Sequence, residues 1–137
     1  MSVVSELIRV EANGAISFGD YSLAAKAKLD NFDVGGDVYK VKTYKDITKL
    51  ERNGMFVYES VPGTAVNDMV LSADGVEFIV ESFEDVQITL ELEPEVDYDI
   101  TVNGNDAGVM KTNLGGKLSL SVELENEEQV KVSVKKK

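Results

Sequence analysis

Cysteine, histidine and tryptophan are absent from this chain, and only two of its 137 residues are proline. Without cysteine there is no disulfide framework and no thiolate metal site. Without histidine the chain lacks the commonest general base, the Ser-His-Asp and Cys-His catalytic systems and every imidazole ligand, so zinc is excluded as well. We therefore expect a protein that is not an enzyme and that carries no cofactor.

Long apolar runs and targeting signals are absent too. No window approaches the roughly 18 apolar residues that a membrane-spanning helix needs. The segment that begins the sequence has no basic leading region, no apolar core and no small-residue cleavage site, so it does not predict a signal peptide. The glycines never fall in the spacing of a phosphate-binding loop. These absences predict a soluble cytoplasmic protein.

Negative charge dominates the chain, and it is unevenly spread. The net charge is −11, from 25 acidic and 14 basic residues. Residues 1–61 hold nine acids and eight bases, a balance of −1, whereas residues 62–137 hold sixteen acids and six bases, a balance of −10. Such a surface repels phosphate backbones and anionic headgroups. We expect neither nucleic acid nor a membrane as a partner.

The clearest pattern in the sequence is an alternation of apolar and polar residues from Val86 to Val102. A period of two indicates strands with one buried and one solvated face. Pro94 cannot donate a ladder hydrogen bond, so we predict two strands, 86–92 and 96–103, that meet at a corner there. Their buried faces would share a core. Their outer faces would carry five acids, namely Glu91, Glu93, Glu95, Asp97 and Asp99.

The same kind of pattern continues to the end of the chain. After Val61-Pro62-Gly63-Thr64, short strands recur with a turn signal between each pair, typical of an immunoglobulin-like or fibronectin-type β-sandwich. We predict seven strands, at 66–71, 76–80, 86–92, 96–103, 107–112, 117–124 and 130–134, with the turn before the last at 125–128. The predicted organisation is an all-β chain with an N-terminal β-hairpin module at 1–61 and this sandwich at 62–137.

Hairpins are predicted in the N-terminal module. Asn13-Gly14 is a strong turn signal between two apolar runs. Residues 24–44 predict a second hairpin, in one of two registers. A two-residue Gly35-Gly36 turn sets Asp30 opposite Val41, and a three-residue turn sets Asp30 opposite Lys40. We favour the second, which pairs apolar with apolar residues and adds an ion pair.

Residues 45–53 fit two structures. A short helix capped at Asn53-Gly54 is one, because Ile47 and Leu50 lie three residues apart. A strand that turns at Asn53-Gly54 into residues 55–58 is the other, and we favour it because strands surround it.

Interaction residues are predicted from the favoured register of the second hairpin. In that register four lysines share one face with two aromatic rings. This face could bind an acidic glycan, pack against an acidic strand of another subunit, or simply cover the core with extended lysine side chains. The residues are Lys26, Lys28, Lys40, Lys42, Phe32 and Tyr44, with Glu91 and Asp99 as the acidic counterpart.

Carboxylates offer two further hypotheses. Glu93, Glu95 and Asp97 at the predicted corner are weak calcium candidates, whereas the loop that begins at Asn31 departs from the EF-hand pattern because Lys42 stands where the last glutamate ligand belongs. A pair among the five acids could also serve a glycosidase, but nothing in the sequence indicates the apolar pocket that a catalytic acid needs.

Two segments resemble a family of short all-β proteins from anaerobic Gram-positive bacteria that are commonly labelled endosialidase. They are residues 42–64, KTYKDITKLERNGMFVYESVPGT, and residues 111–124, KTNLGGKLSLSVEL, and the resemblance extends over nearly the whole chain. A sialidase needs three arginines for the substrate carboxylate, and this chain has only Arg9 and Arg52. No sialidase residue is therefore carried over. The resemblance then implies a non-catalytic β segment of a tail-like protein and a role in assembly.

Together these features favour a non-enzymatic structural or interaction protein that self-associates into a homo-oligomer or filament, with another protein as a possible partner. A near-neutral module with a basic face and a module of charge −10 on the same chain make head-to-tail contacts electrostatically available. An accessory module for glycan or calcium is the alternative, and a carboxylate-pair glycosidase is a second one.

Overall fold

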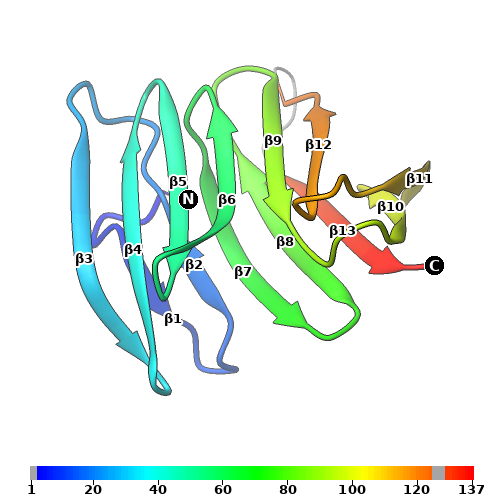
Figure 1. The fold of residues 1–137 in the computed structure, drawn as a ribbon. Helices are drawn as coiled ribbons and strands as arrows, with labels where there is room; N and C mark the ends of the chain where they lie inside the picture. The colour runs from blue at the N-terminus through cyan, green and yellow to red at the C-terminus, as the bar shows by residue number, and fades with distance from the viewer. Residues whose placement is uncertain (1–2, 125–128) are drawn as a thin grey trace.

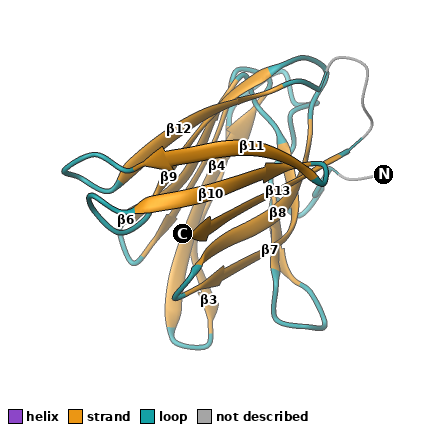
Figure 2. Cartoon of the chain, turned by 90° about the vertical axis from the view of Figure 1, so that its right-hand side faces the viewer, coloured by secondary structure: helices purple, strands orange, loops and turns teal. Residues whose placement is uncertain are grey.

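The computed structural model describes residues 3–124 and 129–137, which form two antiparallel β-sheets and no helix (Figures 1 and 2). Sheet A has the order β1 (Ile8–Val10), β2 (Ile16–Phe18), β7 (Ala65–Ser72), β8 (Gly75–Glu81), β13 (Val130–Lys136), β10 (Asp97–Val102) and β11 (Asn105–Lys111). Sheet B has the order β12 (Lys117–Val122), β9 (Val86–Glu91), β6 (Met55–Val61), β5 (Ile47–Arg52), β4 (Asp37–Tyr44) and β3 (Ala27–Val34). The predicted all-β class is confirmed.

The core lies between the two sheets, where alternate residues of each strand meet. Strands β9 and β12 show the pattern clearly, because every second residue is buried and the residues between them are partly or fully exposed. Tyr58 of sheet B is fully buried between two rings of sheet A. Its ring centroid lies 5.3 Å from that of Phe18 and 5.6 Å from that of Phe78, both edge to face. Such edge-to-face pairs add stability beyond the area that they bury.

Both parts of the chain contribute to both sheets. In sheet A, β2 pairs with β7, and in sheet B, β6 pairs with β9. One continuous cluster of buried residues includes side chains from before and after residue 61. The predicted boundary at 61/62 therefore does not separate two cores. The segment after Val61 is a crossing from sheet B to sheet A, with a cis Val61-Pro62 bond.

The seven strands predicted after residue 62 are present close to their predicted positions, as β7 to β13. They do not form a closed sandwich by themselves. Sheet A takes β7, β8, β13, β10 and β11, whereas β9 and β12 join sheet B, which β3–β6 complete. The sandwich thus needs the N-terminal hairpins, which supply four of the six strands of sheet B. The predicted turn at 125–128 lies outside the described residues.

The N-terminal hairpins follow their turn signals. Asn13-Gly14 lies in the loop between the antiparallel strands β1 and β2. Asn53-Gly54 connects β5 to β6, and both of its residues have positive φ, 53° and 78°, as a tight two-residue hairpin turn requires. Residues 47–52 are therefore strand and not helix.

The hairpin of β3 and β4 uses both predicted registers. Next to the Gly35-Gly36 turn, Val34 pairs with Asp37, which is the two-residue register. Farther along, Leu29 pairs with Val41, which is the three-residue register. A β-bulge between Leu29 and Phe32 joins the two, with Asn31 at a φ of 59°.

A chain of buried hydroxyl groups connects sheet B to the crossing segment. The Thr43 hydroxyl accepts a hydrogen bond from the Asp20 N–H (2.9 Å) and lies 2.8 Å from the Thr48 hydroxyl. The Thr48 hydroxyl donates to the Thr64 carbonyl (2.9 Å) and accepts from the Thr64 N–H (3.0 Å). The Thr64 hydroxyl lies 2.8 Å from Tyr58 Oη. These hydroxyls hold the crossing segment in the core without an unsatisfied polar side chain among the described residues.

The part of the chain that the structure describes contains no helix that is long and apolar enough to cross a membrane.

Candidate functional site

Three lysines lie side by side on the outer face of sheet B. Lys28 of β3 is the register partner of Lys42 of β4, and Lys42 is the partner of Lys49 of β5. We call these three residues the lysine row. Like charges directly opposite each other on neighbouring strands destabilise a sheet, so this arrangement costs the isolated molecule stability. The row therefore concentrates positive charge on one part of an acidic protein.

Two more of the predicted lysines flank the row. The Lys26 ammonium lies 5.6 Å from the centroid of the Tyr44 ring, a cation–π distance. Lys40 is exposed and is the register partner of Glu51, whose carboxylate is 3.5 Å from the Lys49 ammonium. Within residues 3–124 and 129–137, neither Lys26, Lys28, Lys40 nor Lys42 forms an ion pair with a carboxylate. Their charge is thus available to a partner.

The prediction for Phe32 was wrong. The bulge at Asn31 reverses the alternation of β3, so Phe32 packs against the core and not beside the lysines. Phe56 of β6 takes the aromatic place on the outer face instead. Its ring centroid is 5.7 Å from the Lys49 ammonium and 4.9 Å from that of Lys117. Phe56 lies next to these lysines because β5, β6, β9 and β12 are neighbours in sheet B. The sequence alone does not predict that order of strands.

The remaining outer face of sheet B, over β9 and β12, is polar and nearly neutral. Thr89 and Ser119 are hydrogen-bonded at 3.1 Å, and the Ser121 hydroxyl donates to Gln87 at 2.7 Å. Glu91, a predicted interaction residue, lies 3.7 Å from the Lys117 ammonium. The charge of Glu91 is therefore already paired with a lysine of the same chain.

The five predicted acids do not form one row. The corner at Pro94 joins β9 of sheet B to β10 of sheet A (Figure 1). Glu91 and Asp99 therefore lie on opposite outer faces of the sandwich. Asp97 and Asp99 are both exposed, two residues apart on β10. Asp99 is the register partner of Lys135, but the Lys135 ammonium is bound to Glu77 at 3.0 Å. The outer face of β10 thus offers two carboxylates that form no ion pair among the described residues.

The calcium candidates are not gathered into a site. The Glu93 carboxylate is paired with the Lys136 ammonium, and Glu95 and Asp97 are exposed. No group of three acidic side chains within the described ranges has the geometry to hold a metal ion.

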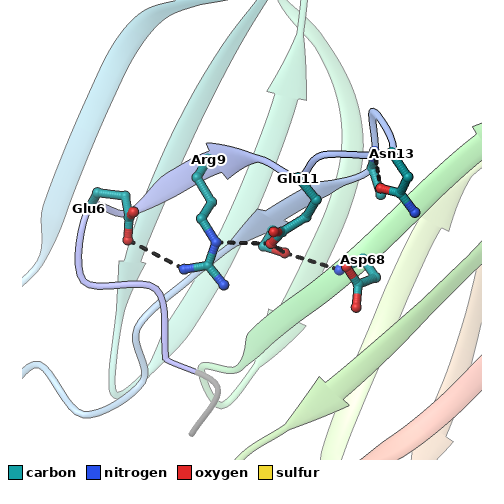
Figure 3. Close-up of polar contacts among 7 residues, drawn as sticks. Glu6, Arg9, Glu11, Asn13 and Asp68 are labelled. Atoms are coloured by element: carbon teal, nitrogen blue, oxygen red, sulfur yellow. Dashed lines mark hydrogen bonds and ion pairs between the residues drawn. The ribbon is translucent and has the colours of Figure 1, made fainter.

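A second polar cluster lies on the outer face of β1, β2 and β7 (Figure 3). The Arg9 guanidinium is paired with Glu11 at 2.9 Å and with Glu6 at 3.5 Å. Buried Ser17 donates its hydroxyl to Glu11 and accepts the Asp68 N–H at 3.1 Å. The hydrogen bond from Ser17 lowers the pKa of Glu11, and the Arg9 bond adds to this effect. No pattern in the sequence predicts this cluster, which stabilises the joint between β2 and β7.

This cluster predicts a pH dependence of stability. The folded-state pKa of Glu11 is depressed, so its contribution is present above the ordinary value of about 4.5 and is lost as pH falls through the folded value. Glu11→Gln should lower the free energy of unfolding at pH 7 and flatten its decline below about pH 4.5. Urea unfolding from pH 7 to pH 2.5 measures both effects, and parallel curves for the two proteins would contradict this role of Glu11.

Comparisons of the chain with protein-family models, with curated proteins and with solved structures found no match.

Proposed function

We propose that this protein is a non-enzymatic building block that self-associates, and that the lysine row of one copy binds the outer face of β10 on another. The observation that carries the proposal is the row itself, Lys28, Lys42 and Lys49 on three adjacent strands. An anionic partner relieves the mutual repulsion that the isolated sheet bears. Binding of an anionic partner to the row therefore stabilises the sheet.

A second copy of the chain supplies the complementary charge. Asp97 and Asp99 lie on sheet A, the row lies on sheet B, and the two sheets present opposite outer faces. A contact between unlike faces is heterologous, so two joined copies still have one free row and one free β10 face between them. Repetition of this contact produces a ring if it closes and a filament if it does not.

Charge reversal tests this contact. Lys28→Glu with Lys42→Glu reverses the charge of two members of the row, so that the row repels a carboxylate face, while position 42 gains an opposite charge in its register partner Lys49. We expect the mass measured by light scattering at low salt to fall below that of the wild type, toward the 15.0 kDa of the monomer. Mixing this variant with Asp97→Lys/Asp99→Lys should restore assembly, because the reversed row then meets a reversed β10 face.

The control variant makes the same change of charge at two lysines outside the row. Lys45→Glu with Lys137→Glu alters two exposed lysines outside the row, and it should assemble like the wild type. If the row variant assembles as well as this control, the row is not a contact.

A glycan would give a different result. A wild type that stays monomeric but binds heparin, a sulfated polysaccharide, through Lys28 and Lys42 would favour the accessory-module alternative over self-association.

A further inference from the structure

A cleft opens between the two sheets at the end of the sandwich where β5 turns into β6 and β7 into β8. Its volume is about 360 Å³. Val57 of sheet B and Leu71 and Tyr98 of sheet A contribute apolar walls. A neighbouring cleft of about 290 Å³ between the same sheets shares Leu71 with it. The two form one partly apolar hollow across this end of the molecule.

Arg52 lies in the wall that the two clefts share. Along β5 the inward positions are Thr48, Leu50 and then Arg52, so the guanidinium continues the inner face at the end of the core. It is half-buried and forms no side-chain hydrogen bond or ion pair with any described residue. An inward cation without a counter-charge, beside apolar walls, fits an anionic group carried on an apolar body.

The acids at the cleft do not supply that counter-charge. Glu91 is paired with Lys117, and Glu93 is paired with Lys136. Asp37 in the neighbouring cleft accepts a hydrogen bond from Asn53 at 3.0 Å. Arg52 is therefore the group whose charge an incoming ligand can match.

The opposite end of the sandwich carries a carboxylate next to an apolar ring. Strand β8 begins at Gly75 in the cleft wall and spans seven residues, about 20 Å, before the loop at 82–85. Phe83 in this loop is 71% exposed, and its ring is held edge to face against Tyr21 at a centroid distance of 4.7 Å. Glu84, the next residue, is exposed. An exposed apolar ring and an exposed carboxylate thus lie on adjacent residues of this loop.

We infer that Phe83 and Glu84 of one copy dock into the Arg52 cleft of the next copy, so that sandwiches join end to end. This inference rests on the proposed self-association and adds a second contact to the lysine row. The ring of Phe83 enters between the apolar walls, and the carboxylate of Glu84 pairs with the Arg52 guanidinium. A desolvated arginine–carboxylate pair with an adjacent aromatic anchor is the composition typical of interface hot spots.

Two charge reversals test the contact. Arg52→Glu and Glu84→Lys each place like charges together when a variant meets itself, so each alone should raise the concentration for half-assembly about tenfold or more. In an equimolar mixture, the lysine introduced in one variant meets the glutamate introduced in the other, and the unchanged Glu84 meets the unchanged Arg52. Every contact between unlike variants then joins opposite charges. Sedimentation velocity should show assembly restored in the mixture and in no single variant.

Further variants separate the contributions. Phe83→Ser removes the ring without a change of charge, and it should weaken assembly as well. Asp46→Lys is the control, because it makes the same change of charge as Glu84→Lys at the same end of the sandwich. Asp46 is exposed in the turn between β4 and β5, close to Gly63. This variant should assemble like the wild type. Circular dichroism confirms that each variant is folded before the comparison.

Each outcome has one meaning. Folded single variants that assemble like the wild type, or a mixture that fails to recover, would overturn the end-to-end contact and leave the lysine row untouched. A wild-type chain that stays monomeric would instead contradict the proposed self-association itself.

Discussion

Replacing Thr48 by valine is expected to lower the free energy of unfolding by about 3 kcal/mol. Valine has nearly the same shape but no hydroxyl. The substitution leaves the Thr64 N–H without its acceptor and removes the partner of the Thr43 hydroxyl, both in the fully buried core. Each buried polar group left unsatisfied costs about 1–3 kcal/mol.

Urea unfolding followed by circular dichroism measures this loss. Thr89→Val is the matched control, since the Thr89 hydroxyl bonds to Ser119 on the surface, and its change should stay within about 0.5 kcal/mol. Equal effects of the two substitutions would show that the buried hydroxyl chain contributes no more than a surface hydroxyl pair.

The second large effect is expected at Tyr58. Tyr58→Ala removes a fully buried ring that contacts Phe18 and Phe78 from across the sandwich, and it should cost about 4–5 kcal/mol. Tyr58→Phe keeps both ring contacts and removes only the hydroxyl bonded to Thr64, so its cost should be about 1–2 kcal/mol.

The difference between the two variants separates packing from hydrogen bonding at one position. Tyr44→Ala, on the outer face of sheet B, provides the surface comparison. If Tyr58→Ala were no worse than Tyr58→Phe, the ring contacts between the sheets would not be what holds the layers together.

Local pattern predicted most of the strands because it reports directly on burial. The alternation around Ile88 and Leu120 marks one buried face per strand, and Asn53-Gly54 marks a turn that needs two positive φ values. Alternation does not say which sheet a strand joins. The sequence therefore does not predict the pairing of β6 with β9, and the predicted boundary at residue 61 cuts through a shared core.

Bulges explain the error at Phe32. A bulge adds one residue to a strand and reverses the face of every residue after it. Here the bulge includes Asn31, which has a φ of 59° in the structure. In the sequence it shows only as a single asparagine, which does not by itself predict a bulge. The lysines before the bulge kept their predicted face. Arg52 had a usable signal, because it follows Thr48 and Leu50 at a spacing of two, but its importance depends on the cleft that the far sheet completes.

The acids around Pro94 show the same limit. Glu91 and Asp99 continue one alternation in the sequence, yet the corner carries the chain from one sheet to the other. The consequence is functional: separate faces carry the lysine row and the β10 carboxylates, which is what a repeating contact between copies requires.

Self-association is tested most directly by the mass of the wild-type chain in solution. Light scattering over a range of concentrations should show a mass that rises above 15.0 kDa at low salt and returns toward it at high salt, because the proposed contacts rely on charge. A mass of 15.0 kDa at every concentration and every salt would contradict self-association.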